Sequence, residues 1–148
     1  MTIRSPYLRR VTEIIMQHGH AVQYVHGDLD AGTRPFAYTV GLHAQDNRGY
    51  ELAVSGLDAE TLHGLLNTLP HTLADHSLEP VDGLELDGVL KDGLLLRLRP
   101  VSRPERLAII AALYDVTPPV WQALWPDQHG RFPNDDQMAQ LWRAQPLL

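Results

Sequence analysis

The sequence contains no cysteine, which excludes a disulfide framework, thiol catalysis and zinc sites built on thiolates. This absence fits a reducing compartment. The sequence also lacks the apolar run of a signal peptide near Met1. No stretch approaches the roughly 18–20 apolar residues of a membrane helix. We therefore predict a cytoplasmic protein with no membrane partner.

Positive charge is also scarce, because the formal net charge is −6 at pH 7. Such a balance opposes general binding to a phosphate backbone, so no nucleic-acid partner is predicted. The eight histidines should add positive charge as the pH falls through about 6.5. No dinucleotide-binding glycine motif, P-loop or nucleophile elbow is present, and no cofactor is predicted.

A length of 148 residues with 44% hydrophobic content predicts a single domain over 1–148. Ser5 is expected to cap the first helix and Gly19 to end it. Pro70 is expected to kink or restart the second helix near Thr68. Segments with helical spacing of apolar residues are 6–18, 58–73, 102–117 and about 134–144.

Extended segments fill most of the remaining chain. Phe36–Leu42 alternates large and small residues, as a half-buried strand does. Asp92-Gly93 suits a hairpin turn that needs positive φ. The order of elements predicts an α+β fold, with a mostly antiparallel sheet of about five to six strands and three to four helices covering one face. The predicted strands are 20–26, 36–42, 50–55, 84–90, 94–101 and 120–125.

Several short motifs occur once each along the chain. They are Pro35–Leu42, Glu51-Leu52 leading to Gly56-Leu57, Leu65–Asn67, Arg97–Val101, Trp125–Asp127, Gly130–Pro133 and Gln145–Leu148. With these motifs, the chain from His18 onward resembles the bacterial family called domain of unknown function 4262. Two departures are visible. Tyr50 stands before Glu51 where the family tends to have His-Pro, and Asn134 stands where it often has tryptophan. The resemblance implies no activity.

Glu51 lies in an otherwise apolar strand, where an unpaired carboxylate would be costly. We expect a structural partner such as Arg97 or Arg99. A general base with a raised pKa, or a side chain facing water, is the alternative. On the preceding strand, Tyr38 and Thr39 face opposite sides. They are candidate ligand contacts, although a core tyrosine that hydrogen-bonds at the sheet edge is an ordinary arrangement.

Arg97 and Arg99 share one strand face, and together they can hold a carboxylate or phosphate. Alternatively, they form a solvated face balanced by acidic residues of the neighbouring strand: Asp82, Glu85 and Asp87. Trp125, Asp127 and Arg131 belong to a proline-rich loop. That loop either locks the C-terminal segment onto the core, or lines a pocket or contacts a partner.

The histidines do not match a standard zinc pattern. His18, His20 and His26 straddle a predicted helix end and strand, while His63, His71 and His76 are interpreted as scattered around a helix. No metal site is predicted.

Three functions remain open. The first is a non-enzymatic module that binds a small anionic ligand or a protein partner. The second is a flavin- or other cofactor-binding small enzyme of split-barrel-like architecture, and the third is a histidine-metal hydrolase. Homodimerisation through an exposed sheet edge also stays open.

Overall fold

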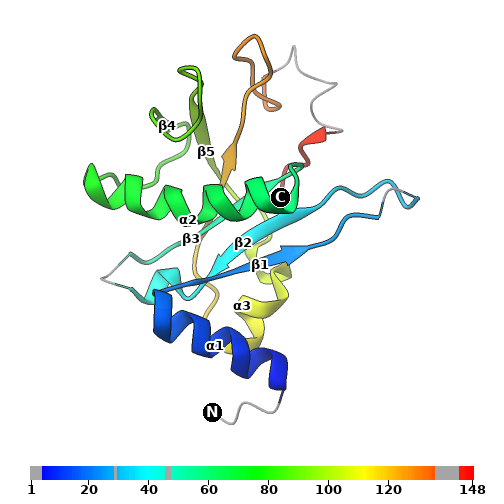
Figure 1. The fold of residues 1–148 in the computed structure, drawn as a ribbon, viewed down its shortest axis with the longest axis vertical. Coiled ribbons are helices and arrows are strands. Elements are labelled where there is room, and N and C mark those ends of the chain that lie inside the picture. The colour runs from blue at the N-terminus through cyan, green and yellow to red at the C-terminus, as the bar shows by residue number, and fades with distance from the viewer. Residues whose placement is uncertain (1–4, 29, 46–47, 136–143) are drawn as a thin grey trace.

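The computed structural model describes residues 5–28, 30–45, 48–135 and 144–148. They form one six-stranded sheet in the order β1-β2-β3-β6-β5-β4 (Figure 1). Neighbouring strands are antiparallel except β3 and β6, which are parallel. The strands are β1 Ala21–Val25, β2 Phe36–Val40, β3 Glu51–Ser55, β4 Glu85–Leu86, β5 Leu96–Pro100 and β6 Val120–Leu124.

Three α-helices accompany the sheet: α1 Pro6–His18, α2 Ala59–Asp75 and α3 Ala108–Leu113. Two 3-10 helices, η1 Leu42–Ala44 and η2 Pro104–Arg106, complete the described elements. These features confirm the α+β prediction and its strand and helix counts. Most of the segment predicted as a helix over 134–144 lies outside the described residues.

Capping residues at both ends set the limits of α1. The Ser5 side chain accepts a hydrogen bond from the Leu8 backbone, and Gly19 ends the helix in a left-handed conformation with φ of 91°. Both predictions are confirmed. The third helix is shorter than predicted, because Tyr114 already has an extended backbone. A 3-10 turn replaces its predicted first part.

Pro70 neither ends nor restarts α2, which runs unbroken from Ala59 to Asp75. The predicted restart near Thr68 is wrong. Proline lacks the N–H that would bond the carbonyl four residues earlier, which belongs to Leu66. Pro70 itself is buried in the hydrophobic core, where its packing supports the helix.

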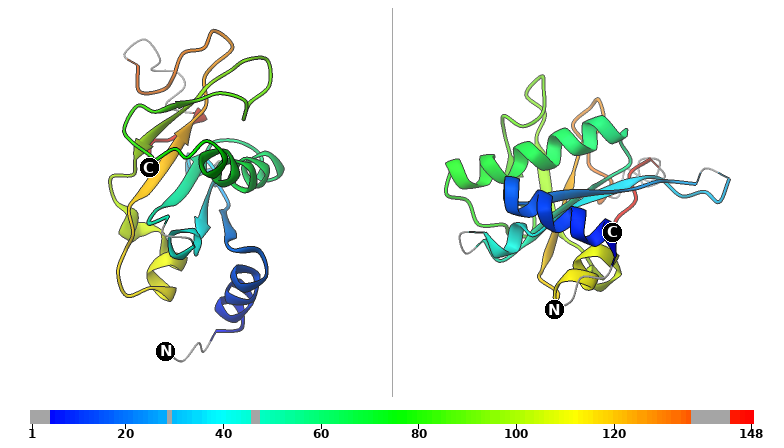
Figure 2. Two further views of the ribbon diagram at one scale, coloured as in Figure 1. Left: turned by 90° about the vertical axis from the view of Figure 1, so that its left-hand side faces the viewer. Right: turned by 60° about the horizontal axis from the view of Figure 1, so that its bottom comes forward.

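Apolar side chains are buried on both faces of the sheet, so the prediction that helices cover only one face is wrong. The leucines of α2 pack on one face with Leu52 and Val54. Val11 of α1 and Ile110 of α3 pack on the other. Figures 1 and 2 show α1 and α3 at one end of the molecule and α2 lying across the sheet above them. Every residue of β3 is therefore buried.

β4 and β5 form the predicted hairpin with its turn at Asp92-Gly93, but β4 ends at Leu86 and β5 begins at Leu96, so the strand predicted over 84–90 is wrong beyond Leu86. Asp92 and Gly93 both have positive φ, 61° and 70°, and the Leu94 N–H donates to the Lys91 carbonyl across the turn. The paired part of the hairpin is short, since β4 contains only two residues.

Candidate functional site

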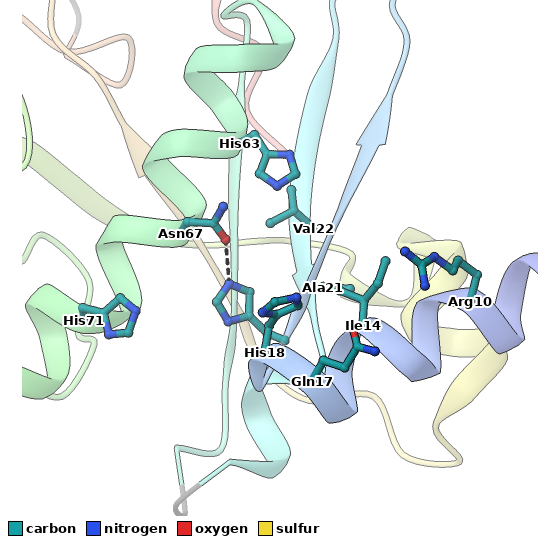
Figure 3. A pocket seen from close by; sticks show the side chains of 10 residues that line it. Arg10, Ile14, Gln17, His18, Ala21, Val22, His63, Asn67 and His71 are labelled. Atoms are coloured by element: carbon teal, nitrogen blue, oxygen red, sulfur yellow. Dashed lines mark hydrogen bonds between the residues drawn. The ribbon is translucent and has the colours of Figure 1, made fainter.

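A groove of about 530 Å³ lies where α1, the start of β1 and α2 meet (Figure 3). Ile14, Ala21 and Val22 are its apolar lining residues. The polar residues that line it are Arg10, Gln17, His18, His20, His63, Asn67 and His71. Four of the eight histidines of the sequence therefore meet at one place.

The residues of α1 and α2 that line the groove follow the periodicity of a helix. His63, Asn67 and His71 follow one another at four-residue intervals on α2, so they lie on one face of that helix. Figure 3 shows these side chains along the same side of α2. The interpretation of His63 and His71 as scattered is therefore wrong. Arg10 and His18 bracket Ile14 on α1 with the same spacing.

His20, which immediately precedes β1, lines the groove and contacts α2. Its Nε2 lies 3.1 Å from Asn67 Oδ1. Burial lowers the pKa of His20, and the positive charges of His71 and Arg48 act in the same direction. The hydrogen bond to Asn67 opposes this shift. His20 is therefore a structural donor that also senses nearby positive charge.

No carboxylate is among the described residues that line the groove. Glu13 forms an exposed ion pair with Arg10, 3.3 Å between Nη1 and Oε2, but is not a lining residue. In a chain with 18 acidic and 12 basic residues, this local composition is unusual. The groove consequently presents imidazole, guanidinium and amide groups to whatever enters it.

The groove histidines do not form a metal centre. Within residues 5–28, 30–45, 48–135 and 144–148, no group of three or more His, Asp or Glu side chains could hold a metal ion. The groove therefore offers hydrogen bonds and positive charge without a preformed set of ligands.

Glu51, a residue singled out from the sequence, lies at a different place, between the ends of β2 and β3. Its side chain has no exposure to solvent. Oε1 accepts hydrogen bonds from the Thr39 hydroxyl at 2.7 Å and the Leu42 N–H at 3.1 Å. Oε2 accepts from the N–H groups of Gly41 and His43, and the His43 ring contacts the same oxygen.

These partners account for the burial of Glu51 without Arg97 or Arg99, so the expected arginine partner is wrong. Burial raises the pKa of the Glu51 carboxyl, while hydrogen bonds from His43 and Thr39 oppose that shift. The carboxylate holds the first residues of η1, where β2 turns away from β3. Gly41 is left-handed there (φ 91°), and a Cβ on it would lie 2.7 Å from an Ile15 methyl carbon of α1.

Tyr38 and Arg99 project from the same face of the sheet, because the register aligns Tyr38, Ala53, Gln122 and Arg99 in one row. The Tyr38 hydroxyl accepts the Ile109 N–H, which ties β2 to α3. Arg99 donates to the Gln122 side chain at 3.0 Å and to the Leu148 carbonyl at 2.9 Å. α3 and Leu148 therefore occupy this face of the sheet beside Tyr38 and Arg99.

Arg97 also has partners within the chain. Its guanidinium lies 4.1 Å from the centre of the Phe132 ring and 3.0 Å from a carboxylate oxygen of Asp135. Glu85 on the neighbouring strand lies 3.5 Å away, as the balanced-face alternative anticipated. The arrangement joins β5 to the loop after β6.

The loop after β6 is tied to the core and to itself. The Trp125 indole donates to the Ser55 carbonyl at 2.8 Å, and the Trp125 backbone exchanges two hydrogen bonds with the Gln145 side chain. Asp127 accepts from the Arg131 guanidinium and backbone within the same turn. This geometry resembles the locking arrangement more than a pocket.

None of the ligand contacts predicted from the sequence lines the groove. Thr39 meets Glu51, and Tyr38 bonds the backbone of α3. Arg97, Arg99 and Trp125 bond residues late in the chain, while Asp127 and Arg131 bond each other. Arg10 and Asn67 were missed. The four-residue spacing of polar residues at 63, 67 and 71 could have indicated a polar helix face. It could not reveal a groove, because the groove also requires α1 on the opposite side.

With this geometry in place, comparison with known families gives one result. The family model "Domain of unknown function (DUF4262)" matches residues 14–139 of the 148. The chain belongs to this family, as its motifs indicated. No curated protein and no solved structure matches it significantly. Among the described residues, no helix has the length and apolar character needed to cross a membrane.

Proposed function

We propose that this chain is a non-enzymatic binding module whose ligand carries negative charge and occupies the groove between α1, β1 and α2. The observation that carries the proposal is the composition of the groove lining. Arg10 and four histidines surround the space, and no carboxylate lines it. Its volume of about 530 Å³ is in the range of small-ligand sites.

Hydrogen bonding and charge favour an anionic ligand in this groove. Guanidinium and protonated imidazole groups form charge-assisted hydrogen bonds with carboxylates and phosphates. Asn67 can add an amide donor. Ile14 and Val22 provide apolar surface for the uncharged part of a ligand. Because only a protonated imidazole is cationic, binding should strengthen as the histidines of the groove become protonated.

No specific observation favours the two other functions. The sheet is open, since β1 and β4 lie at opposite ends of the strand order, and this is not a closed barrel. The described histidines do not assemble into a metal site, which removes support for a histidine-metal hydrolase.

The test is a titration with two small anions, inorganic phosphate and glutarate, monitored by NMR of the histidine rings and backbone amides. We expect saturable shifts at His18, His63 and His71, which weaken with added salt. The double variant H63Q/H71Q should weaken binding. The matched control H129Q alters an exposed histidine in the 127–131 turn and should leave binding unchanged. Equal binding by both variants, or no shifts in the groove, would contradict the proposal.

A further inference from the structure

The groove contains an unpaired sheet edge. β1 is the terminal strand, and among the described strands it pairs only with β2. Ala21 and Val22, the first residues of β1, line the groove together with the two helices. Figure 1 shows β1 passing between α1 and α2, and Figure 3 shows the same opening from close by.

An edge strand presents backbone N–H and C=O groups that can pair with a further strand. In an antiparallel arrangement, alternate residues point these groups outward. One outward group of β1 is already engaged within the strand, because the Gln23 amide donates to the Tyr24 carbonyl. That contact is 3.4 Å long and uses a partly exposed side chain, so an incoming backbone N–H can replace it.

The two helical walls would meet opposite faces of such an incoming strand. α2 packs on the face formed by Val22 and Tyr24, and α1 packs on the face formed by Ala21 and Val25. Successive side chains of a strand point alternately to the two faces. One set would therefore face His63, Asn67 and His71 on α2, and the other would face Arg10 and His18 on α1.

The spacing of the α2 side chains suits a strand. Four helical residues rise about 6 Å along the axis. Two strand residues, which separate side chains on one face, advance about 6.6 Å. His63, Asn67 and His71 can therefore meet successive same-face side chains of an extended peptide. An α-helix in the groove would leave the edge groups of β1 unpaired.

The charge of the groove indicates which side chains this peptide carries. Arg10, His18, His63 and His71 favour Asp or Glu side chains and disfavour Lys or Arg. We propose that the groove binds an extended, acidic peptide segment of a partner protein, which adds to the free edge of β1 as a further strand. This inference rests on the proposed function and names its ligand class. Main-chain pairing supplies affinity, and the histidine walls supply selectivity.

A second copy of this chain is a less favourable occupant of the same edge. Two copies paired edge to edge would place one histidine-lined groove against another, and both would gain positive charge as the pH falls. An acidic peptide has no such conflict.

The test uses an acetylated, amidated octapeptide of alternating Glu and Thr with the full chain at about pH 6.5 and low salt, where histidine charge and weak screening favour the contact. We expect binding by calorimetry, with amide protection of alternate residues in 21–25 by hydrogen exchange. A Lys-Thr octapeptide should not bind. H63Q/H71Q should weaken binding about five- to twentyfold, as expected for loss of two exposed charged contacts, and H129Q should not change it.

Two N-methylated octapeptides test the strand pairing directly. One carries N-methyl groups on the Glu residues and the other on the Thr residues, so each removes the N–H groups along one edge. We expect one of them to lose at least tenfold in affinity. If both bind as well as the parent peptide and β1 gains no protection, strand addition is refuted.

The remaining outcomes separate the two proposals. Shifts with phosphate or glutarate but no binding of the octapeptide would overturn this inference and leave the proposed function intact. No response in the groove to any of these probes would overturn both. A dimer in the absence of peptide, with β1 amides already protected, would assign the edge to a second copy and refute the peptide.

Discussion

Glu51→Gln tests the central structural assignment, because this substitution keeps the shape of the side chain and removes its negative charge. Five donors converge on the Glu51 carboxylate: the Thr39 hydroxyl, three backbone N–H groups and the His43 ring. A carboxylate accepts at both oxygens. An amide accepts at one and donates at the other, so one side of the cluster must lose its acceptor.

The smallest loss follows if the amide nitrogen takes the position of Oε1. The Thr39 hydroxyl can rotate to accept from it, but the Leu42 N–H then faces another donor. An orphaned buried N–H costs about 1–3 kcal/mol, and bonds to a charged acceptor are stronger than bonds to a neutral one by about 1 kcal/mol. Because removal of a buried charge recovers some desolvation cost, we expect a net loss of about 2–4 kcal/mol.

The assay is equilibrium unfolding in urea at about pH 7, where the midpoint should fall with little change in slope. Glu79→Gln is the matched control, since Glu79 is exposed and such surface changes usually lie within about 0.5 kcal/mol. Thr39→Val completes a double-mutant cycle with Glu51→Gln. Residues that share a buried hydrogen bond should couple by at least about 0.5 kcal/mol. A loss below about 1 kcal/mol, together with no coupling to Thr39, would contradict this assignment of Glu51.

Two further predictions concern pH and cooperativity. The pKa of His20 is lowered from 6.5 by burial, so the unfolded chain binds more protons; His20 should therefore cost stability as the pH falls below 6.5 and none well above it. His20→Gln should flatten the decline in unfolding free energy between about pH 7.5 and 5.5, and an unchanged decline would contradict the assignment. We also propose that the chain unfolds as a single domain, because the two hydrophobic clusters share strands β2, β3 and β6. Tryptophan fluorescence and far-ultraviolet circular dichroism should then give coincident transitions, whereas two separated transitions would contradict it.

Local features of the fold could be predicted where neighbouring residues decide the conformation. Ser5 and Gly19 set the limits of α1 through contacts within a few residues of chain. Asp92-Gly93 sets a turn because its backbone favours positive φ. The alternating pattern of 36–42 predicted β2, since strand periodicity is written directly into the sequence.

The same local rules failed where distant partners decide the outcome. Pro70 is a helix breaker by local criteria, yet α2 continues with Pro70 and its neighbouring leucines buried in the core. The alternation in β2 indicated one buried face. α1 and α3 cover the second face, and no pattern within the strand reveals their position.

The amino-acid sequence by itself determined the class of fold, the family and the acidic overall charge. Tertiary structure alone decided which polar groups meet. Backbone donors of 41–43 surround Glu51 because β2 turns into η1 there. Histidines of α1, of α2 and of the residue before β1 line one groove because both helices flank β1. These contacts between distant polar groups depend on where whole helices and strands pack. The packing energy that sets those positions is summed over the core and is not encoded near any one residue.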